Sequence, residues 1–274
     1  MLSVSTVLFD GHPMEAGFEL LAARGIHAVE PAFIKGYIDF TETDFCDAAA
    51  ARLSRSVAAF GLAIQAVSTH MDLSTGDAGD ALARRIDFAA TLGNPFLITN
   101  TGPQHAEAEI RATLDRAARR LEKTGVTLAL ENPGHGSGDL IGTPQQAASL
   151  IASIGHPNIA LNVDIGNFAT YGGSVGTLNG LQRALDHAVH VHLKDFREVD
   201  GDWRFTAIGD GDMPWTDILP ALAHLPIGLE LPLRLLRPRK SDPVRAKSAV
   251  PLDEIETTLD RSMGYIRKHM PLHG

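Results

Sequence analysis

The sequence has a single cysteine, Cys46, among its 274 residues. One cysteine excludes an internal disulfide framework and any zinc site built from four cysteines. No apolar run reaches the roughly 18 residues of a membrane span, and the first residues lack the basic leader of a secretory signal. We therefore expect a cytoplasmic protein with no membrane partner.

Positive charge is also scarce. Lys and Arg total 24 against 33 Asp and Glu, which gives a net charge of −9. A surface with this balance disfavours binding to nucleic-acid phosphates, so no nucleic-acid partner is expected. Hydrophobic residues make up 44% of the chain and charged residues 21%, as in a packed globular protein rather than a disordered one.

Short apolar segments alternate with longer amphipathic segments along the chain. The apolar segments are rich in Val, Ile and Leu, as is typical of parallel strands buried on both faces. These predicted strands are residues 3–8, 27–32, 62–69, 95–100, 126–131, 158–164, 188–194 and 226–231. Helices are predicted between them at 14–24, 42–60, 77–92, 104–123, 143–154, 178–187, 215–224 and 252–269.

Eight strand–helix repeats predict an α/β fold, a single (β/α)8 TIM barrel in one domain of residues 1–274. The alternative is an open, doubly wound sheet, which usually has a glycine-rich phosphate turn after its first strand. Here the first strand is followed by Phe9-Asp10-Gly11-His12-Pro13, which lacks that turn. The barrel is therefore favoured.

Polar side chains stand at the carboxyl ends of the predicted strands, where a buried strand should be apolar. In a TIM barrel these ends surround the active site. Taken singly, each residue has an ordinary explanation as a cap, an ion-pair partner or a core histidine. Their common position predicts one polar site. The residues are Glu30, His70, Asn100, Glu131, Asp164, His192, Lys194 and Glu230.

Three carboxylates in this set, Glu131, Asp164 and Glu230, would repel one another at one buried mouth. A divalent cation between them would remove that repulsion. With His192 they offer three oxygen ligands and one nitrogen, a donor set that suits Mn²⁺, Mg²⁺ or Co²⁺. Four protein ligands also leave positions open for substrate oxygens, as a catalytic site requires.

Four segments contain these candidate ligands, and a glycine-containing loop follows the third. The segments are Leu128-Ala-Leu-Glu131-Asn132, Leu161-Asn-Val-Asp164-Ile-Gly-Asn167, Val189-His-Val-His192-Leu-Lys-Asp195 and Gly228-Leu-Glu230, and the loop is Ile208-Gly-Asp-Gly-Asp-Met-Pro-Trp215. In their order and spacing they resemble the xylose-isomerase-like barrels of the sugar-phosphate isomerase/epimerase superfamily. The resemblance covers essentially the whole chain.

The resemblance implies a metal-dependent isomerase or epimerase of a keto-sugar or sugar phosphate. Glu131, Asp164, His192 and Glu230 would bind one divalent metal ion, with Mn²⁺ expected first and Mg²⁺, Co²⁺ or Zn²⁺ as alternatives. Glu131 and Glu230 would also be the catalytic acid–base pair. One removes a proton from the carbon next to a carbonyl while the other returns one, and the metal stabilises the enediolate.

A second group of residues is predicted to bind the carbohydrate substrate. Related epimerases often have histidine at the position of Asn167, and asparagine cannot titrate near neutral pH. Members of the family usually have an arginine after the histidine-bearing strand, and Arg197 lies near that position but not at the expected spacing. For Lys194 the alternative role is an ion pair with a neighbouring carboxylate. For His70 the alternative role is a hydrogen bond that supports another residue of the site. The predicted substrate-binding residues are His70, Asn167, Lys194, Arg197, Asn100 and Glu30.

Other functions use related barrels. A lyase or dehydratase acting on an inosose or a 3-keto-glycoside needs the same proton abstraction, and the residues do not separate it from an isomerase. An apurinic-site endonuclease is less favoured, because Asn167 replaces one of its histidine ligands and the net charge is acidic. The intact ligand set argues against a non-catalytic sugar-binding barrel. A homodimer or homotetramer fits this kind of barrel.

The segment of residues 232–247 is basic. It contains six Lys and Arg residues and one acid, Asp242. Its prolines disfavour a long helix there. It is predicted to be a solvated loop or a subunit contact, with an anion-binding lid as the alternative.

Overall fold

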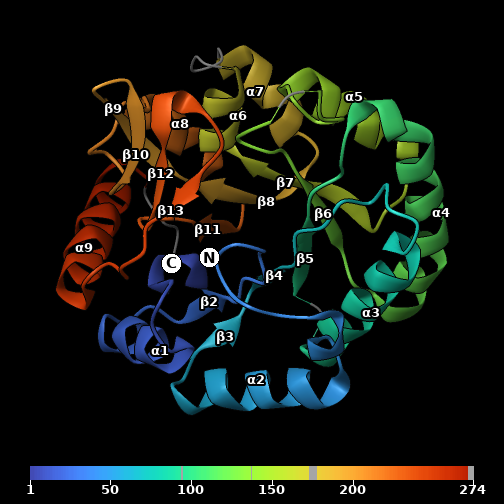
Figure 1. Cartoon of the computed structure of the whole chain (residues 1–274), viewed down its shortest axis with the longest axis horizontal. Coiled ribbons are helices and arrows are strands. Elements are labelled where there is room, and N and C mark those ends of the chain that lie inside the picture. The colour runs from blue at the N-terminus through green and yellow to red at the C-terminus, as the bar shows by residue number, and fades with distance from the viewer. Residues whose placement is uncertain (94, 137, 173–177, 271–274) are drawn as a thin grey trace.

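The computed structural model describes residues 1–93, 95–136, 138–172 and 178–270. Its main sheet is parallel, with the strand order β3-β2-β1-β11-β8-β7-β6-β5-β4, and helices surround it (Figure 1). The predicted TIM barrel is confirmed. The strands are β1 (Leu2–Ser5), β2 (Ala28–Glu30), β3 (Ala63–Ile64), β4 (Ala66–Ser68), β5 (Phe96–Thr99), β6 (Leu128–Glu131), β7 (Ile159–Asp164), β8 (Ala188–Leu193) and β11 (Ile227–Leu229).

The predicted strand at 62–69 is interrupted at Gln65 and becomes β3 and β4. β3 pairs with β2, whereas β4 pairs with β5. The backbone N–H of Phe33 donates to the carbonyl of Ser68 at 2.7 Å, on the far side of the interruption. One continuous stretch of chain therefore joins the two ends of the sheet and closes the ring.

The predicted helices are present, with differences near two of them. Helix α6, directly after β7, was not predicted, because its glycines at both ends reduce helix propensity. The helix predicted at 215–224 ends at Ile218 and continues as a 3-10 turn that contains Pro220. The helices are α1 (Met14–Ala23), α2 (Asp47–Ala59), α3 (Ala78–Thr91), α4 (Glu107–Thr124), α5 (Pro144–Ile154), α6 (Ile165–Gly172), α7 (Leu178–Leu185), α8 (Trp215–Ile218) and α9 (Leu252–His269).

Among the helices that the structure describes, none is long and apolar enough to cross a membrane.

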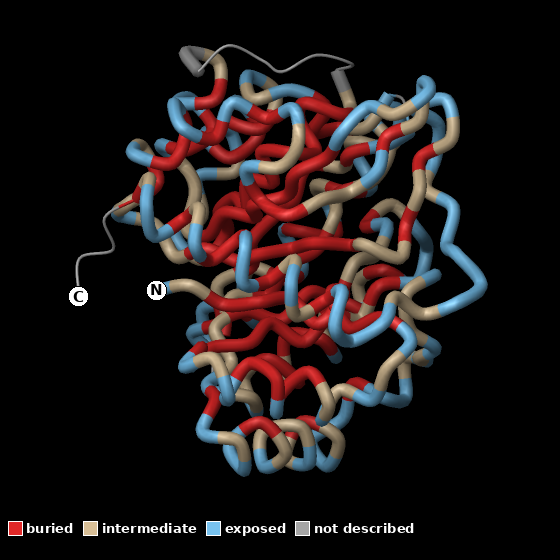
Figure 2. Tube along the Cα trace, turned by 90° about the vertical axis from the view of Figure 1, so that its left-hand side faces the viewer, coloured by how far each residue is buried: buried red, intermediate tan, exposed pale blue. Residues whose placement is uncertain are grey.

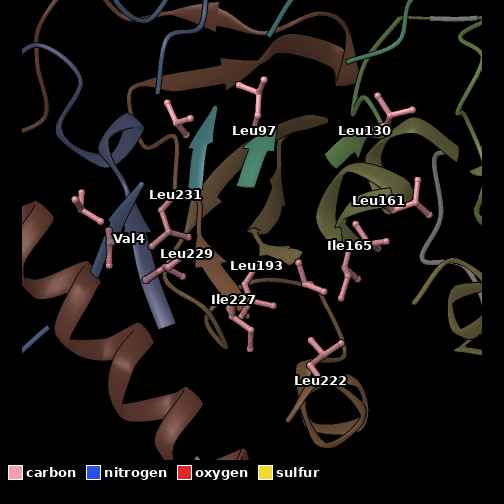
Figure 3. Close-up of a cluster of buried hydrophobic side chains, with 14 of the residues drawn as sticks. Val4, Leu97, Leu130, Leu161, Ile165, Leu193, Leu222, Ile227, Leu229 and Leu231 are labelled. Carbon is pink, nitrogen blue, oxygen red and sulfur yellow. The ribbon is translucent and has the colours of Figure 1, made fainter. Parts of the chain in front are cut away.

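The main core lies between the barrel and its helices. Strand residues such as Val4, Leu130 and Leu161 belong to it, together with helical residues such as Leu222 (Figure 3). The strands run through the buried interior, and exposed residues lie on the outer helices and loops (Figure 2). Because side chains alternate along a strand, the residues between these apolar ones face the inside of the barrel.

The inside of the barrel is apolar in one layer and polar in the next. Ala66, Ile98 and Ala129 form a small buried cluster, separate from the main core. One pleat further along their strands come polar residues, including Ser68 and Glu131, which are also buried. The barrel therefore presents a buried polar layer toward the carboxyl ends of its strands.

A second, antiparallel sheet has the order β13-β12-β10-β9 and was not predicted. Its strands are β9 (Asp195–Val199), β10 (Asp202–Thr206), β12 (Leu235–Arg237) and β13 (Val244–Arg245). It is assembled around the buried Trp203. The Phe196 ring lies 5.1 Å from the Trp203 ring, and the Arg237 guanidinium lies 4.9 Å from it.

The basic segment supplies two strands of this sheet, and its cations are largely engaged within the chain. Arg234 and Arg245 both pair with the buried carboxylate of Asp10, where Arg245 Nε donates to Oδ2 at 2.8 Å. Lys240 pairs with Glu198 at 2.7 Å. These contacts tie the segment to the first βα loop and to β9, so it is an ordered structural element rather than a solvated loop.

Candidate metal centre

The four predicted ligands lie together at the carboxyl ends of adjacent strands. Glu131 ends β6, Asp164 ends β7, His192 lies in β8 and Glu230 directly follows β11. The register pairs Asp164 with His192, and it pairs His192 with Gly228 on the other side. All four residues are buried, and one ligand atom from each lies within 4.8 Å of the others.

The chemistry of this cluster fits a divalent cation. Asp164 Oδ2 and Glu230 Oε2 are buried, and both face the Lys194 ammonium, at 2.9 and 2.6 Å. Burial raises the pKa of Asp164 to about 7, and the charges of Glu230 and Glu131 add to that effect against the opposing influence of Lys194. Buried carboxylates beside an imidazole form the kind of donor set that binds Mn²⁺ or similar ions.

His192 is held so that one ring nitrogen faces the cluster. Its Nε2 is 2.9 Å from Glu30 Oε2, and the other Glu30 oxygen accepts a hydrogen bond from Ser68 Oγ at 2.7 Å. Nδ1 then lies 3.2 Å from Glu131 Oε2 on the cluster side. A carboxylate that accepts the remote N–H of a ligating histidine fixes its tautomer and raises its basicity. The structure thus places Glu30 behind His192, wholly buried, rather than at the cavity.

Asn162 connects two of the ligands and was not among the predicted site residues. Its Nδ2 donates to Glu131 Oε2 at 2.7 Å and lies 3.1 Å from His192 Nδ1. Its Oδ1 is 2.9 Å from His190 Nδ1, and burial lowers the pKa of His190 to about 3, so that ring is neutral. The sequence signal was its position two residues before Asp164, on the same face of β7.

The contact between Glu30 and His192 predicts that a small change at Glu30 will greatly weaken metal binding. Replacing Glu30 by glutamine preserves its size but removes the anionic acceptor for His192 Nε2–H. We expect divalent-metal affinity to fall by about 10–100-fold, with little change in unfolding temperature. Competition with a fluorescent chelator measures it. Ser68→Ala, which removes the second hydrogen bond to Glu30, should have the smaller effect, and unchanged affinity in Glu30→Gln would refute the role.

Lys194 lies against the cluster. Its Nζ is 2.9 Å from Asp164 Oδ2 and 2.6 Å from Glu230 Oε2, and it donates a hydrogen bond to Asn167 Oδ1 at 3.0 Å. Burial lowers the pKa of Lys194, but the charges of Asp164 and Glu230 outweigh burial and raise it well above its ordinary value. The side chain therefore makes the expected carboxylate ion pair, and it also lines the cavity.

Three more of the predicted substrate-binding residues line the same cavity, whose volume is about 590 Å³. His70 Nε2 lies 3.4 Å from Glu131 Oε2, and Asn167 Nδ2 lies 3.3 Å from Glu131 Oε1. Asn100 Nδ2 donates to the carbonyl of Glu131 at 3.4 Å. Burial lowers the pKa of His70, but the charge of Glu131 more than offsets this, so the net shift is upward. All three residues surround Glu131.

Arg197 is not brought to this cavity. It lies on β9, and its guanidinium donates to the carbonyl of Asp210. Tyr37, by contrast, lines the cavity and was not predicted. Burial raises the pKa of the Tyr37 hydroxyl, and the charge of Glu230 adds to that rise. No periodicity distinguishes this tyrosine in the sequence, because it lies in the loop after β2.

The loop with the Gly-x-Gly pattern is organised by Asp195. The carboxylate accepts the backbone N–H groups of Gly209 at 2.8 Å and of Gly211 at 3.2 Å, and also that of Met213 at 3.3 Å. A Cβ on Gly211 would lie 2.0 Å from Asp195 Oδ1, so a side chain cannot fit there. Gly211 is therefore explained by close backbone approach to the Asp195 carboxylate, whereas Gly209 has a φ of +88° and a Cβ there would lie 2.3 Å from the Tyr265 ring.

Because Asp195 satisfies several backbone N–H groups at once, including the buried ones of Met213 and Phe196, its removal should cost stability. Asp195→Ala is expected to lower the free energy of unfolding by about 3 kcal/mol, since unpaired buried donors cost roughly 1–3 kcal/mol each. Urea denaturation followed by circular dichroism measures the change. Asp217→Ala, at an exposed position on α8, serves as the control and should change stability by no more than about 0.5 kcal/mol. If Asp195→Ala were as stable as the Asp217→Ala control, this explanation of the loop would be contradicted.

Fold and site together define a TIM barrel with a buried carboxylate–histidine cluster at the carboxyl ends of its strands. The sequence model of the xylose isomerase-like TIM barrel matches residues 18–250, and the chain belongs to that family. No curated protein sequence matches the chain.

Solved structures with a similar fold have low sequence identity to the chain. A D-psicose 3-epimerase from Clostridium cellulolyticum H10, with D-tagatose, has a TM-score of 0.74 at 14% identity and covers 98% of this chain and 99% of its own. A D-psicose 3-epimerase in the presence of D-fructose has a TM-score of 0.72 at 16% identity, covering 100% and 99%. A probable 3-DHS dehydratase from Bacillus anthracis has a TM-score of 0.65 at 15% identity, covering 84% and 92%. At these identities the likeness shows the fold.

Proposed function

We propose that the protein is a divalent-metal-dependent isomerase or epimerase that acts on a keto-sugar or sugar phosphate. One observation carries the proposal: two buried glutamates, Glu131 and Glu230, belong to a candidate metal cluster and also line one cavity. Paired carboxylates beside an electrophilic cation are what proton transfer at a carbon next to a carbonyl requires. The epimerases among the structural relatives support the carbohydrate class of substrate.

In this mechanism the two glutamates exchange protons with the substrate carbon. Burial raises the pKa of Glu131, but the charges of His70 and His192 outweigh burial and hold it well below its usual range. Glu131 is therefore ionised, which is the form that can accept a proton, while Glu230 reaches the cavity from the end of another strand and returns one. A bound divalent cation, Mn²⁺ first among Mn²⁺, Mg²⁺, Co²⁺ and Zn²⁺, would offset the negative charge that develops on the substrate oxygens.

The other cavity residues orient the substrate. His70, Asn100 and Asn167 surround Glu131 and present hydrogen-bonding groups to the cavity. Hydrogen bonds to the hydroxyl groups of a sugar would hold the reacting carbon next to Glu131. Such positioning lowers the barrier by restricting the substrate to a reactive orientation.

A lyase or dehydratase is the second candidate. The observation that favours it is Lys194, whose ammonium lines the cavity 2.6 Å from Glu230 Oε2. An ammonium in this position can protonate a hydroxyl or alkoxide as it leaves the carbon next to the deprotonated one. The probable dehydratase among the structural relatives belongs to this reaction class.

The products distinguish the two reactions. The protein, stripped with a chelator and reloaded with each metal in turn, is incubated with ketohexoses, ketopentoses, their phosphates, inososes and 3-keto-glucosides. Nuclear magnetic resonance then identifies the products. Metal-dependent formation of an epimer or an aldose supports the first proposal, whereas an unsaturated product supports the lyase. No metal-dependent conversion of any compound would overturn both.

A further inference from the structure

The charges that line the cavity point to the kind of substrate it accepts. We infer that the cavity takes an uncharged sugar and discriminates against substrates that carry phosphate or carboxylate. The inference rests on the proposed function and narrows it, because the family resemblance leaves both keto-sugars and sugar phosphates open.

Three carboxylates lie on the part of the cavity wall outside the metal cluster. Asp72, Asp139 and Asp242 all line the cavity. Asp72 and Asp242 are exposed, and Asp139 is half-buried. Burial raises the pKa of the Asp139 carboxyl, and the charge of Asp72 contributes to the rise, so the negative charges there already disfavour one another. An anionic group on the substrate would add to this repulsion.

The buried arginine on the cavity wall is already committed to the protein. Arg237 Nε donates to the carbonyl of Ser241 at 2.8 Å, and its two terminal nitrogens donate to the carbonyls of Gly134 and Lys240. Its guanidinium also lies over Trp203, and the residue is only 5% exposed. Arg237 therefore joins the loop after β6 to the antiparallel sheet. Its guanidinium is not free to form the paired hydrogen bonds that would bind a phosphate.

Except for Lys35, the other cationic groups on the wall are held by carboxylates or disfavoured by burial. His70 Nε2 lies 3.4 Å from Glu131 Oε2 and is paired with that carboxylate. Lys194 is held between Asp164 and Glu230. Burial lowers the pKa of His135, which lies 3.5 Å from Asp242 Oδ1. Of the lysines and arginines among the described lining residues, Lys194 and Arg237 have partners within the chain. The exposed Lys35 has none among the described residues.

Another part of the wall is apolar. Ile34 and Leu235 are buried there, and Met71 and Phe205 are half-buried. A phosphate placed against these side chains would lose its hydration without gaining charged donors, which is costly. Hydroxyl groups can instead donate to the surrounding carboxylates, and the C–H faces of a sugar ring can pack on the apolar side chains. The volume of about 590 Å³ is within the usual range for small-molecule sites.

These contacts also bear on the anion-binding lid, the alternative role expected of the basic segment. Arg234 and Arg245 pair with Asp10, Arg237 with backbone carbonyls and Lys240 with Glu198. The segment contributes Leu235, Arg237 and Asp242 to the cavity wall, but these four cations are held by partners within the chain, which argues against an anion-binding lid.

Matched pairs of probes test the inference on the metal-loaded protein. D-Fructose is compared with D-fructose 6-phosphate, and D-ribulose with D-ribulose 5-phosphate, by turnover; ribitol and ribitol 5-phosphate are compared by calorimetric binding. We expect the uncharged member of each reactive pair to have a kcat/KM at least tenfold higher, and ribitol to bind more tightly than ribitol 5-phosphate. Equal or better values for the phosphorylated members would overturn the inference, as would failure of ribitol to bind.

The binding arm separates the two proposals. If ribitol binds in preference to its phosphate but no sugar is converted, the selectivity stands and the proposed isomerase function fails. If sugar phosphates are converted faster than free sugars, the proposed function stands and the inferred selectivity fails.

Variants at the wall locate the source of the discrimination. Asp139→Asn should reduce the preference for ribitol over ribitol 5-phosphate by about fivefold, the effect of one unit charge at close range in water. Asp115→Asn, an exposed residue on α4 outside the lining residues, makes the same change in net charge and should leave the preference unchanged. No effect of Asp139→Asn on the preference, or an equal effect of Asp115→Asn, would contradict the assignment.

Discussion

Replacing Glu131 by glutamine should lower kcat by about 100–10,000-fold while the barrel stays folded, the range expected for loss of a general acid or base. Glutamine keeps an oxygen that can accept the hydrogen bond from Asn162 Nδ2, so the packing around the site is preserved. Glu230→Gln should have an effect of similar size, because proton return depends on that carboxyl. Turnover of the substrate identified in the product screen measures both.

Controls separate loss of chemistry from loss of structure or metal. Glu109→Gln, at an exposed position on α4, makes the same chemical change and should retain full turnover. Thermal unfolding and metal content are recorded for each variant, since both glutamates belong to the candidate metal cluster. Near-normal turnover in Glu131→Gln or Glu230→Gln would remove that residue from the acid–base role.

Replacing Asp164 by alanine should weaken metal binding by more than about 100-fold, beyond the loss expected for a residue that only supports a ligand. Asp164 Oδ2 is a buried oxygen 2.9 Å from the Lys194 ammonium, so its removal also leaves Lys194 with one fewer carboxylate to balance. After dialysis, the metal content by elemental analysis should fall to near zero, and turnover should fall with it.

A second variant at this position controls for structural damage. Asp164 Oδ1 accepts the backbone N–H of Asn167 at 2.8 Å, a contact that alanine would lose. Asp164→Asn keeps an acceptor for that bond but lacks the negative charge, so it should be more stable than Asp164→Ala and still bind metal weakly. Wild-type metal content in both variants would contradict the ligand role of Asp164.

The barrel was predictable because its sequence signal repeats. Apolar strands and amphipathic helices alternate, and the parallel register brings the strand ends to one mouth. The second sheet was not predictable in this way. Two of its strands, β12 and β13, span three and two residues in a basic, proline-containing segment. That sheet depends on long-range packing around Trp203 and on the pairing of Arg234 and Arg245 with Asp10, which no local pattern reveals.

The candidate ligands were predictable for the same reason as the barrel. A polar residue at the end of a buried strand must have partners, and four such ends converge here. How deep each side chain lies below the barrel mouth depends on the stagger between strands, which the sequence does not give. The sequence therefore placed Glu30 near the mouth but could not predict that it lies behind His192. Tyr37 lies on a loop, and Arg197 points toward Asp210, and neither position follows from strand periodicity.

Some expectations concern properties beyond the fold and the site. A cytoplasmic location, the identity of the metal and assembly into a dimer or tetramer stay predictions. Size-exclusion chromatography with light scattering tests the last of these directly.

Deuterium exchange tests the central claim most directly, because it detects proton abstraction whether or not a net product accumulates. The metal-loaded protein is incubated in D₂O with the panel of carbonyl sugars and followed by nuclear magnetic resonance, beside the stripped protein and Glu131→Gln. The account predicts that deuterium enters a carbon next to the carbonyl of at least one sugar, only with metal and with Glu131 intact. Absence of exchange with every sugar while metal is bound, or equal exchange by the stripped protein, would contradict it.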